Sequence, residues 1–254
     1  MVTPDPTRRF SDRVESYILS RPSYPPQVLE TLRQECNLTP ASVVADIACG
    51  TGIFTRLLLE NGNRVLGVEP NREMREAAIR LLASYPKFEA FEGSAESTTL
   101  PDHSVQYVTA AQAAHWFDLP AARREFERIL TPAGWVVLLW NQRVTDSTPF
   151  LVSYEKLLLN YATDYEKVRH EHTTDGIDSF FAPCSFQLRE FPMHQDMDYV
   201  SLERRLLSSS YVPLAGHPNC APMLAELRRL FDANQSGGRI RIDYTTRMYF
   251  AQLV

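Results

Sequence analysis

The sequence predicts an α/β fold, in which a mostly parallel sheet carries helices on both of its faces. Between residues 43 and 140, short apolar runs alternate with stretches of helical periodicity. A glycine-rich turn follows the first of these runs, and the last apolar run of the chain, near its C-terminus, alternates apolar with polar residues. A chain of 254 residues with 44% hydrophobic residues is long enough to bury such a core.

The first half of the chain reads as five strands and the helices between them. Pro25 and Pro26 open the first helix, because proline is well tolerated in a first helical turn. Strands are expected at residues 43–48, 64–69, 88–91, 105–110 and 135–140. Helices are expected after Gly52, after Asn71, which is a suitable N-cap, and after Pro120. The helix after Asn71 has one apolar stripe, made of Met74, Ala77, Ala78, Leu81 and Leu82.

The second half predicts a different arrangement. A helix at 150–161 leads into a polar stretch at 164–179, and an edge strand at 186–191 is expected to stop at Pro192. Helices follow near 202–207 and 223–231, and a last strand covers 239–250. The sum is a Rossmann-like, mostly parallel seven-stranded sheet with an antiparallel last strand and a helical cap. We expect one domain, 1–254, with an N-terminal lid segment at 1–40, a ligand-binding core at 41–141, and cap insertions and closing strands at 142–254.

Composition and charge bear on which classes of partner the sequence supports. The net charge of −5 gives no support to binding of nucleic acid or anionic lipid. No stretch reaches the roughly 20 apolar residues of a membrane helix, and the polar start resembles no leader, so we expect a cytoplasmic protein without membrane attachment. The four cysteines lie far apart, and His170 and His172 lack further ligands at zinc spacing, so no metal site is expected.

The turn Gly50-Thr51-Gly52 is the motif that carries chemistry. It lies between a strand and a helix, where glycine lets a ligand approach the backbone and the helix start points N–H groups at it. Glu69 ends the next strand and can accept hydrogen bonds from the two hydroxyls of a ribose. A glycine pair alone serves many turns, but the joint placement of turn, helix and carboxylate indicates a nucleotide site.

Two ligand classes compete for this site, a nicotinamide dinucleotide and S-adenosylmethionine. Thr55 stands where the dinucleotide motif G-x-G-x-x-G requires its third glycine, which disfavours the dinucleotide. An oxidoreductase dependent on a nicotinamide dinucleotide therefore stays as the alternative, together with a non-catalytic protein that only holds S-adenosylmethionine.

Residues 46–52, Asp-Ile-Ala-Cys-Gly-Thr-Gly, resemble the D-x-x-C-G-x-G loop of class I S-adenosylmethionine-dependent methyltransferases. Residues 67–71 with Met74 resemble the acidic ribose turn of these enzymes, and residues 93–96 with Leu100 and Pro101 resemble their adenine-side turn. The flanks, at 10–25 and 113–117, resemble the small-molecule branch that includes trans-aconitate methyltransferase-like proteins. The likeness covers roughly residues 8–141 and implies transfer of a methyl group to a small-molecule carboxylate, amine or hydroxyl, in a monomer or homodimer.

Carried over residue by residue, the resemblance implies a set of cofactor contacts. The loop would follow the methionine part, Glu69 would hold the ribose, and Pro70 and Met74 would flank the adenine. The expected cofactor-binding residues are Tyr17, Arg21, Asp46, Ala48, Cys49, Gly50, Thr51, Gly52, Glu69, Pro70, Met74, Ser94, Ala95, Glu96, Ala111 and Gln112.

His115 and Trp116 are the candidates for catalysis, because they follow the fourth strand at the carboxyl edge of the sheet, where doubly wound folds bind ligands. Trp116 can face a cation with its ring, and His115 can take a proton from an amine or hydroxyl acceptor. The opposite interpretation is that both residues only pack against the core. Arg204 and Arg205 lie beside an apolar helical stripe and are expected on a solvated face.

Overall fold

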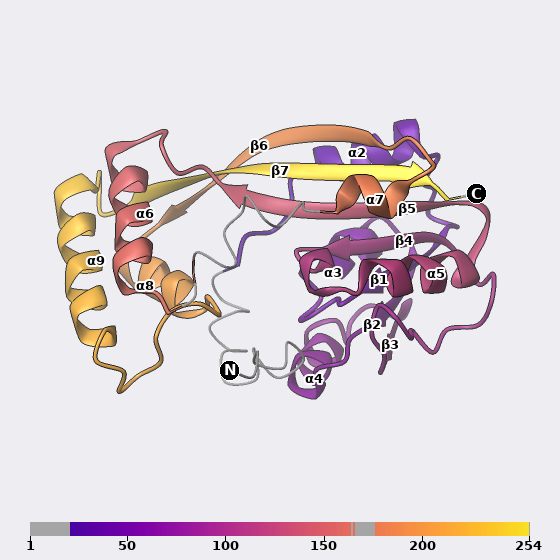
Figure 1. The fold of residues 1–254 in the computed structure, drawn as a ribbon, viewed down its shortest axis with the longest axis horizontal. Coiled ribbons are helices and arrows are strands. Elements are labelled where there is room, and N and C mark those ends of the chain that lie inside the picture. The colour runs from indigo at the N-terminus through magenta and orange to yellow at the C-terminus, as the bar shows by residue number, and fades with distance from the viewer. Residues whose placement is uncertain (1–20, 164, 166–175, 254) are drawn as a thin grey trace.

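The computed structural model describes residues 21–163, 165 and 176–253, and Figure 1 shows the arrangement of their helices and strands. The first half of the expected lid segment, with Tyr17, lies outside the described residues, as does the pair His170 and His172. Among the described helices, none is both long and apolar enough to cross a membrane.

One seven-stranded sheet organises the chain, in the order β3-β2-β1-β4-β5-β7-β6. Strands β1 to β5 pair in parallel, whereas β7 runs antiparallel to both of its neighbours, β5 and β6. The predicted mostly parallel sheet of seven strands with an antiparallel last strand is confirmed. The strands are β1 (Val43–Ile47), β2 (Arg64–Val68), β3 (Phe88–Phe91), β4 (Val105–Ala111), β5 (Leu130–Arg143), β6 (Gln187–Met197) and β7 (Ile240–Gln252).

Helices cover the two faces of the parallel part of the sheet. One apolar cluster joins β1, β4 and β5 to α5 (Leu119–Ile129) and α7 (Ile177–Phe181). A second cluster joins the other face to α2 (Gln27–Glu35) and α3 (Ile53–Glu60). The helix α4 (Arg72–Leu81) packs beside β3, with Asn71 as its N-cap, as predicted. The short 3₁₀ helix η2 (Ala114–Trp116) follows β4.

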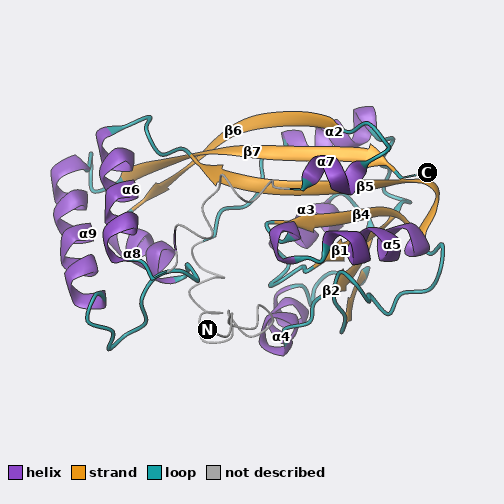
Figure 2. Ribbon diagram, in the orientation of Figure 1, coloured by secondary structure: helices purple, strands orange, loops and turns teal. Residues whose placement is uncertain are grey.

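A helical cap lies at one end of the molecule, on the left in Figure 2. It contains α6 (Pro149–Tyr161), α8 (Tyr199–Leu207) and α9 (Cys220–Asn234), which share a third apolar cluster. Strands β5, β6 and β7 reach from the parallel sheet to this cap, so the same backbone ladder belongs to both parts. The cap and the nucleotide-binding half are therefore joined by continuous strands.

The prediction that Pro192 stops a strand is wrong. Strand β6 continues through Pro192, which pairs with Thr245, to Met197. The order of the strands explains this, because β6 is the outer strand, and proline is tolerated where one side of a strand has no further partner. Strand β5 also extends beyond the predicted range at both ends.

A short helix, α7, occupies the end of the stretch that was expected to be polar and irregular. Its three apolar residues, Ile177, Phe180 and Phe181, are buried in the cluster shared with α5. The helix has only five residues, so its sequence shows too little periodicity to be recognised without its tertiary partner.

Candidate active site

The candidate site lies where β1 and β4 are neighbours, although they are not consecutive in the chain. At such a switch point, the connections leave the sheet in opposite directions and open a crevice at the carboxyl ends of the strands. Ala48, after β1, and Gln112, after β4, have positive φ angles of 54° and 62°. Both residues line the two cavities described below. Left-handed backbone at non-glycine residues is uncommon and concentrates at functional sites.

The glycine turn has the form that the ligand-binding interpretation requires. Gly50 has a φ of 58°, and a Cβ atom added there would meet nothing within 4 Å, so the backbone is open to a ligand. Gly52 has a φ of 85° and is the N-cap of α3, and its added Cβ would lie 2.6 Å from Cδ1 of Leu82. The turn thus needs glycine at Gly50 for access and at Gly52 for close packing.

Asp46 lies beneath this turn and is 1% exposed. Its two carboxylate oxygens accept hydrogen bonds from the hydroxyls of Thr55, at 2.6 Å, and Thr109, at 2.8 Å. Burial raises the pKa of Asp46 to about 6, against the opposing effect of these hydrogen bonds. Thr55, the residue that replaces the third glycine of the dinucleotide motif, therefore serves to hold Asp46.

Glu69 extends from the end of β2 under the same turn. Its Oε2 accepts a hydrogen bond from the N–H of Gly50 at 2.8 Å, and its Oε1 accepts one from the N–H of Asn71 at 2.9 Å. Burial raises the pKa of Glu69, while these two hydrogen bonds and Arg75 oppose the rise. Each oxygen keeps a further lone pair, so the carboxylate can accept from the two hydroxyls of a ribose.

The larger of the two cavities opens beside Glu69, with about 870 Å³ of space that is continuous with solvent. Its mostly apolar walls suit a flat ring. Most of the predicted contacts line it, and sequence reasoning missed Asn71, Ala113 and Phe117. The lining residues are Ala48, Gly50, Glu69, Pro70, Asn71, Met74, Ser94, Ala95, Glu96, Ala111, Gln112, Ala113, Trp116 and Phe117.

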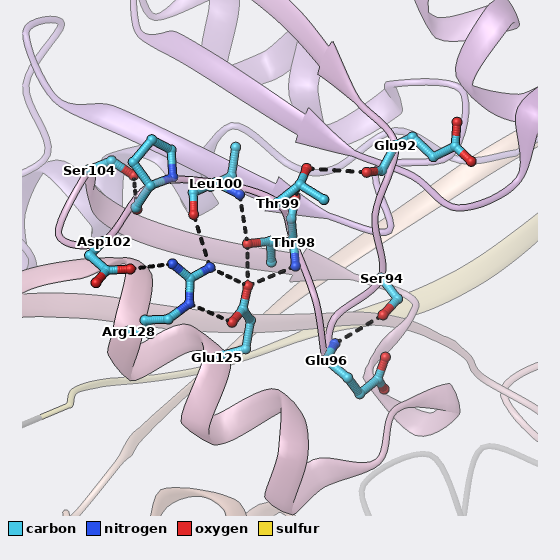
Figure 3. Close-up of polar contacts among 11 residues, drawn as sticks. Glu92, Ser94, Glu96, Thr98, Thr99, Leu100, Asp102, Ser104, Glu125 and Arg128 are labelled. Atoms are coloured by element: carbon cyan, nitrogen blue, oxygen red, sulfur yellow. Dashed lines mark hydrogen bonds and ion pairs between the residues drawn. The ribbon is translucent and has the colours of Figure 1, made fainter.

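A network of hydrogen bonds and ion pairs fixes the loop that carries Ser94, Ala95 and Glu96 (Figure 3). Glu125 of α5 accepts hydrogen bonds from the N–H and the hydroxyl of Thr98, at 2.7 and 2.6 Å. Arg128, one turn further on, donates to Glu125, to Asp102 and to the carbonyl of Leu100. The loop against the larger cavity is thus anchored to α5 through the buried Glu125 and the partly exposed Arg128.

Glu125→Gln is expected to lower the free energy of unfolding by about 1.5 kcal/mol, because it removes a charge-assisted acceptor of Thr98 and Arg128. The hydrogen bond from Arg128 is the main cause that lowers the pKa of Glu125 to about 2. The ionised Glu125 therefore makes its full contribution to the free energy of unfolding above its ordinary pKa of about 4.5. That contribution is lost as the pH falls from about 4.5 toward 2. Urea unfolding at pH 7 and pH 3 measures both effects, and the exposed Glu127→Gln serves as the control. An equal cost at both pH values would contradict the assignment.

The second cavity lies on the other side of Ala48 and encloses about 520 Å³. The Thr51 hydroxyl lies against it, buried and without a hydrogen-bond partner among the described residues. Tyr24 also lines it and packs edge-on against Phe54, with ring centroids 5.1 Å apart. The lining residues are Arg21, Pro22, Tyr24, Asp46, Ala48, Cys49, Gly50, Thr51, Ile53, Phe54, Ala111, Gln112 and Arg205.

The expectation that Arg205 lies on a solvated face is wrong, whereas Arg204 is exposed. Arg205 lines the second cavity from α8, and Leu202 and Leu206 of the same helix are fully buried. Viewed down the helix axis, the side chain of Arg205 leaves the helix about 60° away from that of Leu202, whereas the side chain of Arg204 leaves it about 160° away. This angular offset is the signal that could have separated the two arginines.

The two catalytic candidates do not lie together in the cavity. Trp116 lines the larger cavity, but His115 is not among the described residues that line either one. His115 lies next to Trp116, with ring centroids 4.8 Å apart, and its Nδ1 accepts a 3.4 Å hydrogen bond from the buried Trp140. Any proton transfer by His115 would therefore need a path past Trp116.

Two other side-chain classes offer no chemistry in the described part of the chain. The four cysteines are free, and burial raises the pKa of the Cys49 thiol well above its usual value. In the described ranges, no group of three or more His, Cys, Asp or Glu side chains could hold a metal ion.

Comparison with known proteins shows which family the sequence around this site resembles. A family model described as a methyltransferase domain matches residues 45–138, which contain both Asp46 and Glu69. Residues 45–138 are thus similar to a methyltransferase domain. The match ends at β5, so the family model includes the glycine turn and the adenine-side loop but not the cap.

Relatives of this methyltransferase domain occur in bacteria and fungi. An uncharacterised methyltransferase of Mycobacterium tuberculosis is 39% identical over 141 residues, which are 55% of this chain and 54% of that protein. A methyltransferase-like protein of Schizosaccharomyces pombe is 31% identical over 158 residues, 62% of this chain and 60% of that one. The chain thus matches only a little more than half the length of these relatives.

The methyltransferase fold extends over the whole described chain. A solved structure from Anaeromyxobacter dehalogenans, assigned as a type II methyltransferase, superimposes with a TM-score of 0.67 at 22% identity. The superposition covers 91% of this chain and 97% of that one, so the likeness in fold includes the cap as well as the methyltransferase domain.

Proposed function

We propose that the chain binds S-adenosylmethionine across the two cavities and transfers its methyl group to a small-molecule acceptor. The observation that carries this proposal is the buried pair of carboxylates, Asp46 and Glu69, on either side of a glycine turn that is open to a ligand. The adenosine part fits the larger, flat cavity beside Glu69. The methionine part fits the smaller cavity beside Asp46 and the Thr51 hydroxyl.

Each residue has a role that follows from its position. Glu69 accepts from the ribose hydroxyls, and Pro70, Met74, Ala95 and Phe117 enclose the adenine ring. Asp46 balances the charge of the methionyl amino group, either directly or through the turn. Trp116 lines the larger cavity, and its ring can stabilise a cationic sulfonium there by about 0.5 to 2 kcal/mol.

The chemistry needs alignment and exclusion of water more than it needs a nucleophile on the protein. Held by the glycine turn, Asp46 and Glu69, the cofactor would supply an activated methyl group, and the cavity walls would align that group with a lone pair of the acceptor. A carboxylate acceptor requires no base. An amine or hydroxyl acceptor also releases a proton, and His115 is our candidate to receive it.

Calorimetric titration with S-adenosylhomocysteine and with a nicotinamide dinucleotide tests the proposal. We expect S-adenosylhomocysteine to bind and the dinucleotide to give no heat. Binding of the dinucleotide alone would support the oxidoreductase alternative. Radiolabelled methyl transfer to a panel of small acids, amines and phenols then separates an enzyme from a protein that only holds the cofactor.

His115→Ala is expected to lower kcat several-fold while leaving the Kd for S-adenosylhomocysteine within about twofold. The physical reason is that His115 supports Trp116 from behind but does not line the cofactor cavity. A pH profile of kcat distinguishes its two possible roles, because only a base gives a profile whose acidic limb disappears in the variant. Unchanged kcat from pH 5 to 9 would remove His115 from catalysis.

A homodimer or monomer, the absence of nucleic acid among its partners and a cytoplasmic location remain predictions. Light scattering, a nucleic-acid binding assay and cell fractionation would check them in turn.

A further inference from the structure

Two arginines line the smaller cavity, and their chemistry goes beyond what the cofactor requires. Arg21 comes from the segment before α2, and its Nη2 donates to the carbonyl of Ser208, just after α8, at 2.9 Å. Arg205 comes from α8 itself. Asp46 is the acidic residue among the described lining residues, and the hydroxyls of Thr55 and Thr109 already bind its oxygens. The cavity is therefore suited to an anion.

Arg205 is half-buried, and in the described part of the chain no carboxylate lies within ion-pair distance of it. One of its terminal nitrogens donates to the hydroxyl of Ser209 at 3.1 Å, and its buried Nε has no hydrogen-bond partner among the described residues. Its strongest electrostatic neighbours are the phenol groups of Tyr244, Tyr211 and Tyr154. Burial lowers the pKa of Arg205, but these neighbours raise it overall, so the guanidinium is charged at neutral pH.

Arg143, a buried arginine at the end of β5, shows what a structural role looks like. Arg143 forms a 2.5 Å ion pair with Glu155 and also donates to the hydroxyl of Tyr165 at 3.0 Å. Its charge is neutralised inside the protein. The contrast matters because an enclosed charge without a counterion costs stability, unless a ligand supplies the opposite charge.

We infer that Arg205 binds an anionic oxygen group, a carboxylate, of the methyl acceptor at the smaller cavity. This inference rests on the proposed function of the same site. The planar guanidinium matches a carboxylate with two parallel hydrogen bonds, and the unsatisfied Nε is one of the donors that such a pair uses. The cofactor itself also has a carboxylate, at its methionyl end, and we assign that carboxylate to Arg21.

The test titrates matched acids and amides into protein saturated with S-adenosylhomocysteine. The probe pairs are succinate with succinamide, benzoate with benzamide, and phenylacetate with phenylacetamide. We expect at least one acid to bind wild-type protein more than tenfold more tightly than its amide. Arg205→Met should weaken that acid by about 10- to 100-fold, Arg205→Lys should weaken it less, and neither should change the Kd for S-adenosylhomocysteine by more than about twofold.

Two variants make the result specific. Arg204→Met, on the exposed side of the same helix, should leave all affinities unchanged. Arg21→Met should weaken S-adenosylhomocysteine instead of the acid. The inference is overturned if Arg205→Met weakens S-adenosylhomocysteine and spares the acid, or if wild-type protein prefers none of the acids. Failure of the proposed function is a separate result, in which wild-type protein does not bind S-adenosylhomocysteine at all.

Thermal unfolding without ligands gives an independent measurement. Because Arg205 has no internal counterion in the described structure, Arg205→Met should leave Tm unchanged or raise it by a few degrees. Arg143→Met, which removes the ion pair of Glu155, should lower Tm by several degrees. A fall in Tm of the same size for Arg205→Met would assign Arg205 a structural role and overturn the inference.

Discussion

Glu69→Ala is expected to raise the Kd for S-adenosylhomocysteine by about 100-fold, the largest effect on affinity that we expect from one residue. The substitution removes the charged acceptor of the ribose hydroxyls, and a hydrogen bond to a charged group is worth about 1.5 to 3 kcal/mol. It also leaves the N–H groups of Gly50 and Asn71 without the oxygens that hold them at 2.8 and 2.9 Å. The glycine turn and the start of α4 therefore lose their common anchor.

Calorimetry on wild type, Glu69→Ala and Glu69→Gln measures this effect. Glutamine keeps one acceptor oxygen of similar shape, so its Kd should lie between the other two. Glu76→Gln, on the exposed side of α4, is the control and should bind as wild type does. A folded Glu69→Ala protein with unchanged affinity would show that the ribose does not lie at Glu69.

Asp46→Asn is expected to stabilise the free protein and to weaken its ligand binding. The folded pKa of Asp46, about 6, lies above its ordinary value of 3.8, so the fold disfavours the ionised carboxylate. Stability from this group is greatest at low pH and falls as the pH rises from about 4 to about 6, by a total of about 3 kcal/mol. Asparagine has no such charge, so at pH 7.5 the variant should unfold at a Tm several degrees higher, and at pH 4 the difference should vanish.

Ligand binding should show the opposite sign. A methionyl ammonium group beside Asp46 favours the ionised carboxylate, so wild-type protein should release a proton on binding near pH 6. As the pH rises toward the folded pKa of Asp46, the Kd for S-adenosylhomocysteine should fall by up to about tenfold per pH unit. Above that pKa the Kd should stay constant. Asp46→Asn should bind about tenfold more weakly at pH 7.5 and lack this pH dependence. Equal pH profiles for the two proteins would place the amino group away from Asp46.

The predicted cofactor residues and the observed cavities agree best where one short segment contains both the motif and its geometry. Residues 46–52 and 69–74 lie at consecutive strand ends, so the alternation of strands and helices already places them at one edge of the sheet. Ala48 and Gln112, however, show their positive φ angles only in the structure, because neither is glycine. Their role in shaping both cavities could not be inferred from residue type.

Residues beyond β5 were harder to predict, because their environment depends on distant partners. Arg205 looks like any charged residue on a half-buried helix until α8 is placed over the cavity. Pro192 looks like a strand terminator until β6 is known to be the outer strand. The apolar residues of α7 can be recognised as core residues only once α5 is known to pack against them. In each case the environment of a residue depends on which helix or strand packs against its own element. The periodicity of the sequence does not identify that neighbour.

The unbroken pairing of β5 with β7 limits how acceptor specificity can be engineered. The pairs run without a shift from Trp135 with Gln252 to Arg143 with Tyr244, and the end of this ladder at the cap places Tyr244 beside Arg205. A slip of one residue would turn Tyr244 to the opposite side. A chimera that imports the cap of another methyltransferase should therefore keep the residue register between β5 and β7 where the two parts are joined. Insertions should be placed in the connections between helices, where they do not change this register.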